Sequence, residues 1–477
     1  MSNYFLLKKE NIVKFSIHFL LFALFLTSGC MVGPDYRPPC IDAPAAWKGP
    51  NEGPDFCEEV ENWWEIFDDQ RLNNLEALAV SNNRNLFAAF ERVQEARYRA
   101  GVVAADLYPQ FTLDPLYSNQ EVLLKTLGAP STFLRVHELL YNLPLNLSYQ
   151  MDLWGRLTDQ YYAAKYTWEA QIEDYRLVLL NLTTDLATAY YQLRAADSQI
   201  DLLIATLKTR NKAFDINKSR YEAKIVNYSD VSRAGLEVQN ALTQYEEMVR
   251  QRNVLENRIA VLLGVQPSEF FLEHMPLTTL PPRIPAGIPS EVLLQRPDIA
   301  EIERNMASAH ALVKAAYASF FPSLELTGLV GYSSPALKYF LKHKSFWWMY
   351  GASMDQTVFD GFRKTDNLCL QWSTFKEIGY QYQQQVFVAF QEVENALSDI
   401  QQYAEEYESS KKAVEWAKTT TKIARDRYFQ GVTFYLDVMD SERDELSAEI
   451  IQNNLQGLRF VSTIQLINAL GGSWNCD

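Results

Sequence analysis

The sequence predicts an α+β membrane protein that consists of two copies of one unit, each with two strands and a long helical hairpin. Three features predict it: a repeat at constant offset, four segments of alternating polarity, and two very long segments almost free of proline and glycine. The 477 residues are 48% hydrophobic and 22% charged, which excludes a disordered chain, and the net charge of −15 argues against a nucleic-acid partner. Beyond the N-terminus no apolar run reaches the roughly 20 residues of a spanning helix. This excludes a multi-span helical membrane protein but not a β-barrel.

Residues 1–29 have the pattern of a signal peptide. Three lysines precede the apolar run 15–26, and small residues then lead to Cys30. This end resembles a bacterial lipobox, in which a peptidase cuts before the cysteine and the sulfur carries a diacylglycerol. The usual leucine three residues before the cysteine is Thr27 here, so a plain signal peptide with a chance cysteine stays open. Acyl chains on Cys30 would hold the mature N-terminus at a membrane, and the following Met31 favours the outer membrane.

The other cysteines do not define a disulfide framework. Cys40 and Cys57 lie close together in the sequence, whereas Cys369 and Cys476 are remote. A Cys40–Cys57 bridge fits an oxidising periplasm, and free buried thiols fit equally well. The five histidines are scattered, so the sequence predicts neither a metal site nor a cofactor.

The second half of the chain repeats the first. At an offset of 213, Tyr108-Pro109 aligns with Phe321-Pro322, and at an offset of 207 the match runs without gaps through the long helical segments. Matches at 207 include Arg156 with Arg363, Thr158-Asp159 with Thr365-Asp366, Arg220-Tyr221 with Arg427-Tyr428, Asp230-Val231 with Asp437-Val438, and Leu263-Gly264 with Leu470-Gly471. Helices of similar periodicity do not by coincidence place Pro, Gly and Asp at one offset, so the pattern indicates an internal duplication.

Each copy begins with a helical segment and two strands. Residues 72–106 are helical in composition, and strands are expected over 109–119 and 139–151. The second strand keeps its apolar residues on one face: Leu143, Leu145, Leu147, Tyr149 and Met151. Residues 323–332 repeat this alternation, and 346–350 open a fourth strand with an aromatic cluster typical of a membrane interface. One such segment also fits a half-buried strand of a soluble sheet, but four in an exported chain favour membrane strands.

Four strands cannot close a membrane barrel alone, because known membrane barrels need at least about eight and open edges are not tolerated in lipid. Several chains must therefore share one barrel. A dimer would give about eight strands with a filled interior, whereas a trimer would give about twelve and leave room for a channel.

Long helices follow the strands in each copy. Residues 159–226 contain no proline or glycine, and a helix of ~68 residues would reach roughly 100 Å. Apolar residues recur there at alternating steps of three and four, as in a coiled-coil seam: Leu179, Leu182, Leu186, Ala189, Leu193, Ala196, Ile200, Leu203 and Leu207. Val386, Phe390, Val393, Leu397 and Ile400 repeat the seam in the second copy. Return helices are expected to end near Gly264 and Gly471, so each hairpin is either a structural stalk or the wall of a tunnel.

A proline-rich stretch separates the two copies. It is poor in backbone donors and unsuited to regular structure. The predicted organisation is a signal peptide at 1–29, a first repeat with the lipid anchor at 30–280, the linker at 281–297, and a second repeat at 298–477.

The linker and several short motifs resemble the outer-membrane efflux proteins, the TolC-like family, and within it the lipoprotein branch that serves multidrug efflux. The matching residues are Gly287-Ile288-Pro289-Ser290-Glu291-Val292-Leu293-Leu294-Gln295-Arg296-Pro297-Asp298-Ile299, Phe320-Phe321-Pro322-Ser323, Gly33-Pro34-Asp35-Tyr36, Trp63-Trp64 and Tyr435-Leu436-Asp437-Val438-Met439-Asp440. The resemblance covers essentially the whole mature chain. It implies a homotrimer whose twelve-stranded β-barrel, set in outer-membrane lipid, continues into a long α-helical barrel in the periplasm. It also implies a periplasmic adaptor (membrane fusion) protein and a proton-driven inner-membrane efflux pump as partners.

The same resemblance implies two sites at the hairpin ends. Acidic residues that ring the closed periplasmic mouth in the family match Asp437 and Asp440, which share one helix face. Such a ring attracts cations and cannot close tightly while every carboxylate is ionised. The second site is a latch, in which Asp230 matches an acid that bonds a tyrosine and an arginine on the other hairpin. Tyr428 matches the tyrosine, but Thr433 stands at the arginine position. For all three aspartates, a helix-terminal acid facing the helix dipole is the structural alternative.

The favoured function is an outer-membrane duct that carries drugs or other toxic small molecules from a pump and adaptor complex. The expected location is the outer membrane, by lipid anchor and inserted strands, with the helices in the periplasm. A duct for type I polypeptide secretion is the nearest alternative, and a purely structural coiled-coil lipoprotein is another. An enzyme is not expected, because Gly-x-Ser-x-Gly, His-Glu-x-x-His and phosphate-loop motifs are missing from the sequence.

Overall fold

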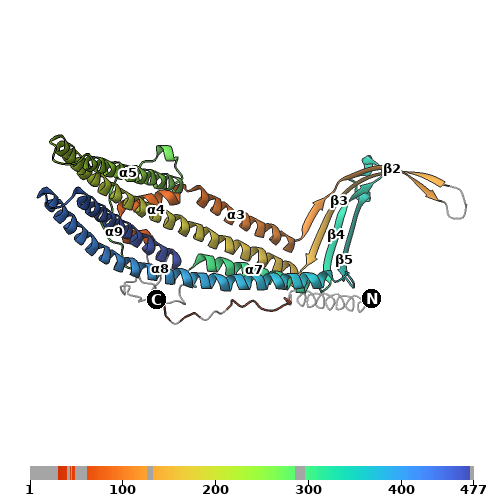
Figure 1. The fold of residues 1–477 in the computed structure, drawn as a ribbon. Coiled ribbons are helices and arrows are strands. Elements are labelled where there is room, and N and C mark those ends of the chain that lie inside the picture. Colours follow the sequence, from red (N-terminus) through yellow and green to blue (C-terminus); the bar gives the residue numbers. More distant parts are fainter. Residues whose placement is uncertain are drawn as a thin grey trace. The chain divides into compact units, whose positions relative to one another are not determined.

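The computed structural model describes residues 31–39, 43–44, 46–48, 62–125, 133–284 and 296–472 (Figure 1). In chain order the elements are η1 (Trp63–Phe67), α2 (Gln70–Asn82), α3 (Arg84–Ala104), η2 (Ala105–Leu107), β1 (Gln110–Leu113), β2 (Leu116–Lys125), β3 (Phe133–Met151), α4 (Arg156–Glu222), α5 (Tyr228–Leu262), η3 (Pro267–Glu269), α7 (Pro297–Ala318), β4 (Ser323–Ser334), η4 (Leu337–Tyr339), η5 (His343–Ser345), β5 (Phe346–Asp355), α8 (Arg363–Phe429) and α9 (Tyr435–Ala469). Among the described helices, none is both long and apolar enough to cross a membrane. Cys30, Cys40, Cys57 and Cys476 lie outside the described residues, and Cys369 is an exposed free thiol on α8.

The element boundaries confirm the internal duplication. The bounds of α4 and α8 lie 207 residues apart at both ends, as do those of α5 and α9. The long helices have 67 residues each and the return helices 35 each. The intervening turns also match, because Lys224 and Gly431 both take the left-handed conformation, with φ of 60° and 75°. Two copies of one hairpin have therefore kept their length and their turn geometry.

Two segments expected to be continuous are broken. The helix predicted over 72–106 is divided into α2 and α3, because Asn83 has an extended backbone and its side chain caps α3 by accepting from Leu86 N at 2.9 Å. The strand predicted over 109–119 is divided into β1 and β2 at Asp114-Pro115, since proline offers no N–H to a sheet. β1 and β2 both pair with β3, so they occupy one edge of an antiparallel sheet that continues through β4 to β5. The sheet thus has four strand positions, as the sequence predicts.

The strand register gathers the predicted apolar positions on one face of the sheet. The register pairs each predicted apolar position of β3 with one on β4: Leu143 with Tyr332, Leu145 with Val330, Leu147 with Gly328, Tyr149 with Leu326, and Met151 with Leu324. The apolar row continues into β5, where Trp348 pairs with Val330. On the opposite face Ser148 donates to Glu325 at 3.0 Å. The alternation typical of membrane strands therefore holds along β3 from Leu143 to Met151. By contrast, Leu329 of β4 and Trp347 and Met349 of β5 are apolar residues on that opposite face.

Pro144 lies inside β3, where proline removes a donor from the ladder. The residue opposite is Gly331, and a Cβ there would come within 2.3 Å of the Leu143 carbonyl oxygen. The backbones approach this closely because residue 331 has no side chain.

The described chain divides into two compact units, and each draws on both repeats. The first unit contains the sheet with the adjoining parts of α3, α4, α7 and α8, and the second contains α2, α5, α9 and the remaining parts of the long helices. In the second unit every seam position of α4 from Leu182 to Leu203 is buried. Ile259 of α5 and Phe460 of α9 join the same core. The predicted seam is therefore buried in α4 from Leu182 to Leu203, whereas in α8 Val386 and Val393 are buried and Phe390, Leu397 and Ile400 are partly buried.

Candidate functional site at the hairpin tips

The hairpins end in two tips of equal construction, where α4 turns into α5 and α8 into α9 (Figure 1). A small core in the second unit joins them. Tyr428, Tyr435, Val438 and Met439 of the second hairpin are buried together with Ala234 of α5. The rings of Tyr428 and Tyr435 lie 5.4 Å apart, and burial raises the pKa of Tyr435. This packing holds the two tips against each other within one chain.

Asp437 and Asp440 lie in the first two turns of α9, and both are exposed. Their neighbours Val438 and Met439 are buried, so the two carboxylates lie on the opposite side of the helix from the tip core. The Thr433 hydroxyl donates to the Asp437 carboxylate, and Asp440 Oδ1 lies 3.5 Å from an arginine of the next turn. The pair therefore presents negative charge on one free face of α9.

Tyr428 is buried at the tip, and its hydroxyl donates to Asn217 Oδ1 of α4 at 2.7 Å. The Arg220 guanidinium lies 4.7 Å from the ring centre. Burial raises the pKa of Tyr428, and the charge of Asp230 raises it further against the opposing effect of Arg220. Asp230 is half-buried at the start of α5 and makes no side-chain hydrogen bond within the described chain. Thus Tyr428 is tied to the first hairpin through Asn217, a residue that the sequence analysis did not identify.

A second set of residues missed by the sequence analysis links the hairpins through charge. Glu237 of α5 is only 4% exposed, and its Oε2 lies 3.0 Å from Arg210 NH1 of α4. Its Oε1 accepts from Arg443 Nε of α9 at 2.9 Å, and Arg443 NH2 donates to the same oxygen. We call Arg210, Glu237 and Arg443 the clasp. Arg443 also lies beside Asp440, so the clasp adjoins the exposed acids of the tip.

The clasp has a clear electrostatic cause. A buried carboxylate is unfavourable unless it is paired, and Glu237 is paired on both oxygens. Its hydrogen bond with Arg443 raises the pKa of that guanidinium. Because one partner belongs to the first hairpin and the other to the second, the charge that stabilises Glu237 also joins the two tips.

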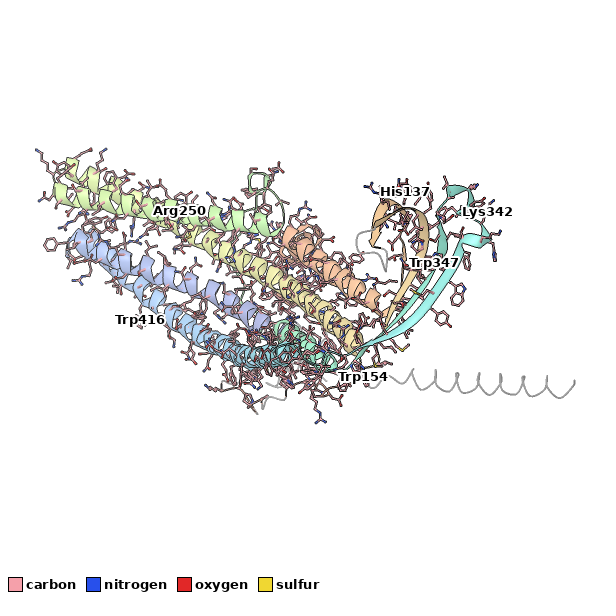
Figure 2. All side chains as sticks on the ribbon, turned by 90° about the vertical axis from the view of Figure 1, so that its right-hand side faces the viewer. His137, Trp154, Arg250, Lys342, Trp347 and Trp416 are labelled. Atoms are coloured by element: carbon pink, nitrogen blue, oxygen red, sulfur yellow. The ribbon has the colours of Figure 1, made fainter. Side chains whose placement is uncertain are left out.

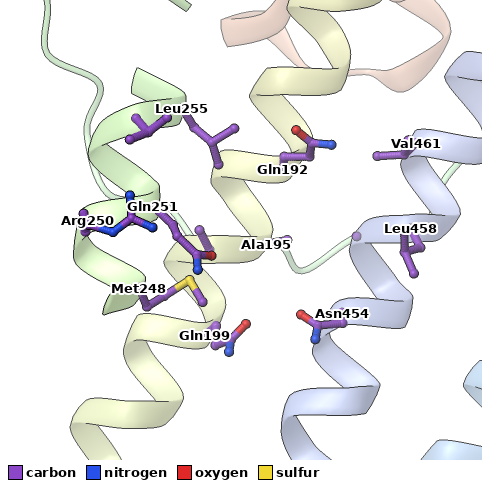
Figure 3. Close-up of a pocket in the computed structure, with 13 residues that line it drawn as sticks. Gln192, Ala195, Gln199, Met248, Arg250, Gln251, Leu255, Asn454, Leu458 and Val461 are labelled. Carbon is purple, nitrogen blue, oxygen red and sulfur yellow. The ribbon is translucent and has the colours of Figure 1, made fainter. Parts of the chain in front are cut away.

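Farther from the tips, residues of α4, α5 and α9 line an open cavity of about 570 Å³ (Figure 3). Its lining combines amides with small and alkyl side chains, among them Gln192, Gln199, Met248 and Leu255. Arg250 is the one charged lining residue, and it is paired with Glu247 outside the cavity at 2.6 Å. The lining therefore offers apolar and neutral polar contacts. Within the described part of the chain, no cluster of His, Cys, Asp and Glu is arranged to hold a metal.

Comparison with known proteins identifies the family whose architecture this chain shares. A family model described as outer membrane efflux protein matches residues 75–265 and 288–472, one match in each repeat. The solvent efflux pump outer membrane protein SrpC of Pseudomonas putida is 29% identical over 463 residues, covering 95% of this chain and 98% of the relative. The cation efflux system protein CusC of Escherichia coli O6:H1 (strain CFT073) is 28% identical over 458 residues, covering 95% and 97%.

Solved structures agree. The outer-membrane channel OprN matches with a TM-score of 0.87 at 29% identity, covering 93% of this chain and 100% of that chain. The predicted fold class is therefore confirmed: the chain is an α+β protein with an internal duplication, folded like an outer-membrane channel.

Proposed function

The chain belongs to the outer membrane efflux protein family, which is not a family of enzymes. We propose that it is the outer-membrane duct of a tripartite efflux system and passes drugs or other toxic small molecules. The observation that carries this proposal is the family match in both repeats, supported by relatives named for the efflux of solvents, toluene and cations. The duct itself is passive. A proton-driven inner-membrane pump supplies the energy, and a periplasmic adaptor protein connects the two.

In this proposal three copies share one barrel. Each chain supplies four strand positions, and the two outer ones each lack a neighbour on one side within the described chain. Unpaired sheet edges are not tolerated in lipid, so neighbouring copies must cover them.

The duplicated tips support the same assembly. Tyr221 and Tyr228 of the first hairpin correspond to Tyr428 and Tyr435, and both pairs have ring centres 5.4 Å apart. The second pair is buried against the first hairpin, whereas Tyr221 and Tyr228 are 44% and 60% exposed. In a closed trimer, the second hairpin of the neighbouring copy would cover the exposed pair in the same way.

The N-terminal segment supports an acyl anchor on Cys30. Val32 N donates to the Trp154 carbonyl oxygen at 3.4 Å, at the point where β3 passes into α4. Trp154, labelled in Figure 2, stacks on Phe321 with ring centres 4.8 Å apart, which is an arrangement suited to a membrane interface. A diacylglycerol on the residue before Met31 would therefore start beside this aromatic pair. Incorporation of labelled palmitate that disappears in Cys30→Ser would support the anchor.

We assign the closed periplasmic mouth to the hairpin tips. Asp437 and Asp440 of three copies would form its acidic ring and concentrate cations there. In the latch proposed for Asp230, Tyr428 and Thr433, the arginine expected on the second hairpin is replaced by Thr433, and the clasp between Glu237 and Arg443 supplies the charged link between the hairpins. Opening the mouth would then require the clasp to separate.

Two measurements test the function. A deletion strain should become sensitive to drugs or solvents and keep its secreted proteins, whereas the loss of a secreted polypeptide without sensitisation would indicate type I secretion. Purified protein in a planar bilayer should conduct. An absence of current even after Asp437→Ala and Asp440→Ala would remove the duct and leave a structural lipoprotein.

A further inference from the structure

We propose that the connection between β4 and β5, residues 335–345, binds the phosphate groups of a phosphorylated glycolipid in the outer leaflet of the outer membrane. This inference rests on the proposed function, because it takes the strands as membrane-spanning. α7 leads into β4, and β5 leads into α8. The connection therefore lies at the end of the strands remote from these helices, where Figure 2 shows Lys342 and, at the start of β5, Trp347. With the helices in the periplasm, this end faces the outer leaflet.

The connection is basic in an otherwise acidic protein. It carries Lys338, Lys342, His343 and Lys344, and no Asp or Glu occurs between Glu325 and Asp355, although acidic residues outnumber basic ones by 59 to 44 in the whole chain. Within the described residues, no carboxylate forms an ion pair with any of these three lysines, although other lysines of the chain are paired in this way. Their positive charge is thus available to a ligand.

Two of these lysines converge on one aromatic ring. The Nζ atoms of Lys338 and Lys342 lie 4.7 and 5.2 Å from the centre of the Tyr339 ring. The turn that brings them together is ordered by local bonds: Lys342 N donates to the Tyr339 carbonyl oxygen at 3.1 Å, and the Ser345 hydroxyl donates to the same oxygen at 2.8 Å. Phe340 packs on Tyr141 of β3 with ring centres 6.0 Å apart. Two cations beside one ring, neither paired with a carboxylate within the described chain, favour an anion with more than one negative charge, such as a phosphate monoester.

The apolar surroundings favour a lipid over a soluble anion. Leu337 and Leu341 of the connection are exposed beside the lysines. Farther along β5, Trp348 and Tyr350 are exposed on the apolar face of the sheet, with rings stacked 5.5 Å apart. In this arrangement the lysines can bind the phosphates of a lipid headgroup, while the adjoining aliphatic and aromatic side chains contact its acyl chains.

The test measures lipid binding to the purified full-length protein by native mass spectrometry. The probes are diphosphoryl lipid A, the same lipid with its phosphates removed, and neutral phosphatidylcholine. The double variant Lys338→Gln, Lys342→Gln is compared with Lys411→Gln, Lys412→Gln, which removes the same charge from exposed positions on α8. A basic residue near an anionic surface contributes roughly fivefold to affinity, so the loop variant should bind lipid A about 30-fold more weakly. The α8 variant should bind it like wild type, and raised salt should weaken wild-type binding.

Three results would overturn the proposal: unchanged affinity in the loop variant, equal binding of the dephosphorylated lipid, or complete displacement of lipid A by inorganic phosphate, which would indicate a soluble anion. Conductance in neutral bilayers separates this inference from the proposed function. Wild-type protein that conducts there but has no preference for phosphorylated lipid overturns this inference alone. Protein that does not conduct even after Asp437→Ala and Asp440→Ala overturns the proposed function as well.

Discussion

Replacing Arg443 with glutamine tests whether the clasp holds the two hairpins together. The change removes the α9 partner of Glu237 and leaves Arg210 in place. Breaking a fully buried ion pair costs about 3–5 kcal/mol, whereas exposed pairs contribute about 0.2–1 kcal/mol. Glu237 is buried but the Arg443 side chain is 46% exposed, so solvent screening reduces the effect to about 1–2 kcal/mol. If the clasp forms only in the closed mouth, this loss raises the open population about 5- to 30-fold.

Single-channel recording in planar bilayers measures that population as open probability. Arg425→Gln is the matched control, because Arg425 pairs with Glu442 of the same hairpin at 2.8 Å and its side chain is 39% exposed. Both variants lose one positive charge at a similar place, but only Arg443 bonds to the other hairpin. We expect a higher open probability for Arg443→Gln and little change for Arg425→Gln.

Glu237→Gln supplies the second arm of a double-mutant cycle. It should also raise the open probability, and adding Arg443→Gln to it should have little further effect, because the two side chains share one interaction. Equal open probabilities for Arg443→Gln and Arg425→Gln, or simple additivity of Arg443→Gln and Glu237→Gln, would refute a clasp that controls the mouth.

Three further predictions concern stability, each measured as a thermal midpoint by circular dichroism. Glu76 of α2 is buried with both carboxylate oxygens unbonded within the described chain, and burial raises its pKa well above 4.5. The folded state keeps the proton while the unfolded state releases it, so stability falls as pH rises past about 4.5, and Glu76→Gln should stabilise more at pH 8 than at pH 5. Burial alone would raise the pKa of Asp298, but the Arg296 guanidinium at 2.6 Å outweighs it and lowers that pKa below 3.8. The resulting stability is present above pH 3.8 and lost below it, so Asp298→Asn should cost about 3 kcal/mol at pH 7 and much less near pH 3. Lys224 has φ of 60°, so Lys224→Gly should stabilise by about 1 kcal/mol, whereas Gly431→Ala, at φ of 75°, should destabilise by a similar amount.

Local patterns in the sequence were sufficient for most of the fold. The seam from Leu182 to Leu203 and the alternation in β3 are periodic, and periodicity survives any tertiary arrangement that buries one face. The breaks at Asn83 and Asp114-Pro115 were missed because the prediction used the average composition of each segment. Such an average does not reveal a single helix-capping residue or a single proline without an N–H group. Asn83 had a readable signal, since an asparagine before an apolar helical run is a preferred N-cap.

The candidate site was less accessible to sequence reasoning. The positions of Asp437, Asp440 and Tyr428 came from resemblance, and the structure places them at the tips. Their bonding partners could not be predicted from the sequence. Asn217 and Tyr428 are 211 residues apart, and Glu237 and Arg443 are 206 residues apart. Contacts at such separations depend on how one hairpin packs on another, which spacing along the chain does not encode.

Divergence between the two copies explains why the clasp occurs once in each chain. At the offset of 207, Glu237 corresponds to Asp444 and Arg443 to Leu236. The clasp joins different positions of the two copies, so a second clasp would require an arginine at 236 and an acid at 444, and Leu236 removes the arginine. The lengths and turns were kept while these side chains diverged, as expected if one hairpin contact lies within a chain and the other lies between chains. Leu236 is exposed and stands where the second contact would place an arginine, so the contact between copies should lack this ion pair and be less sensitive to salt than the clasp.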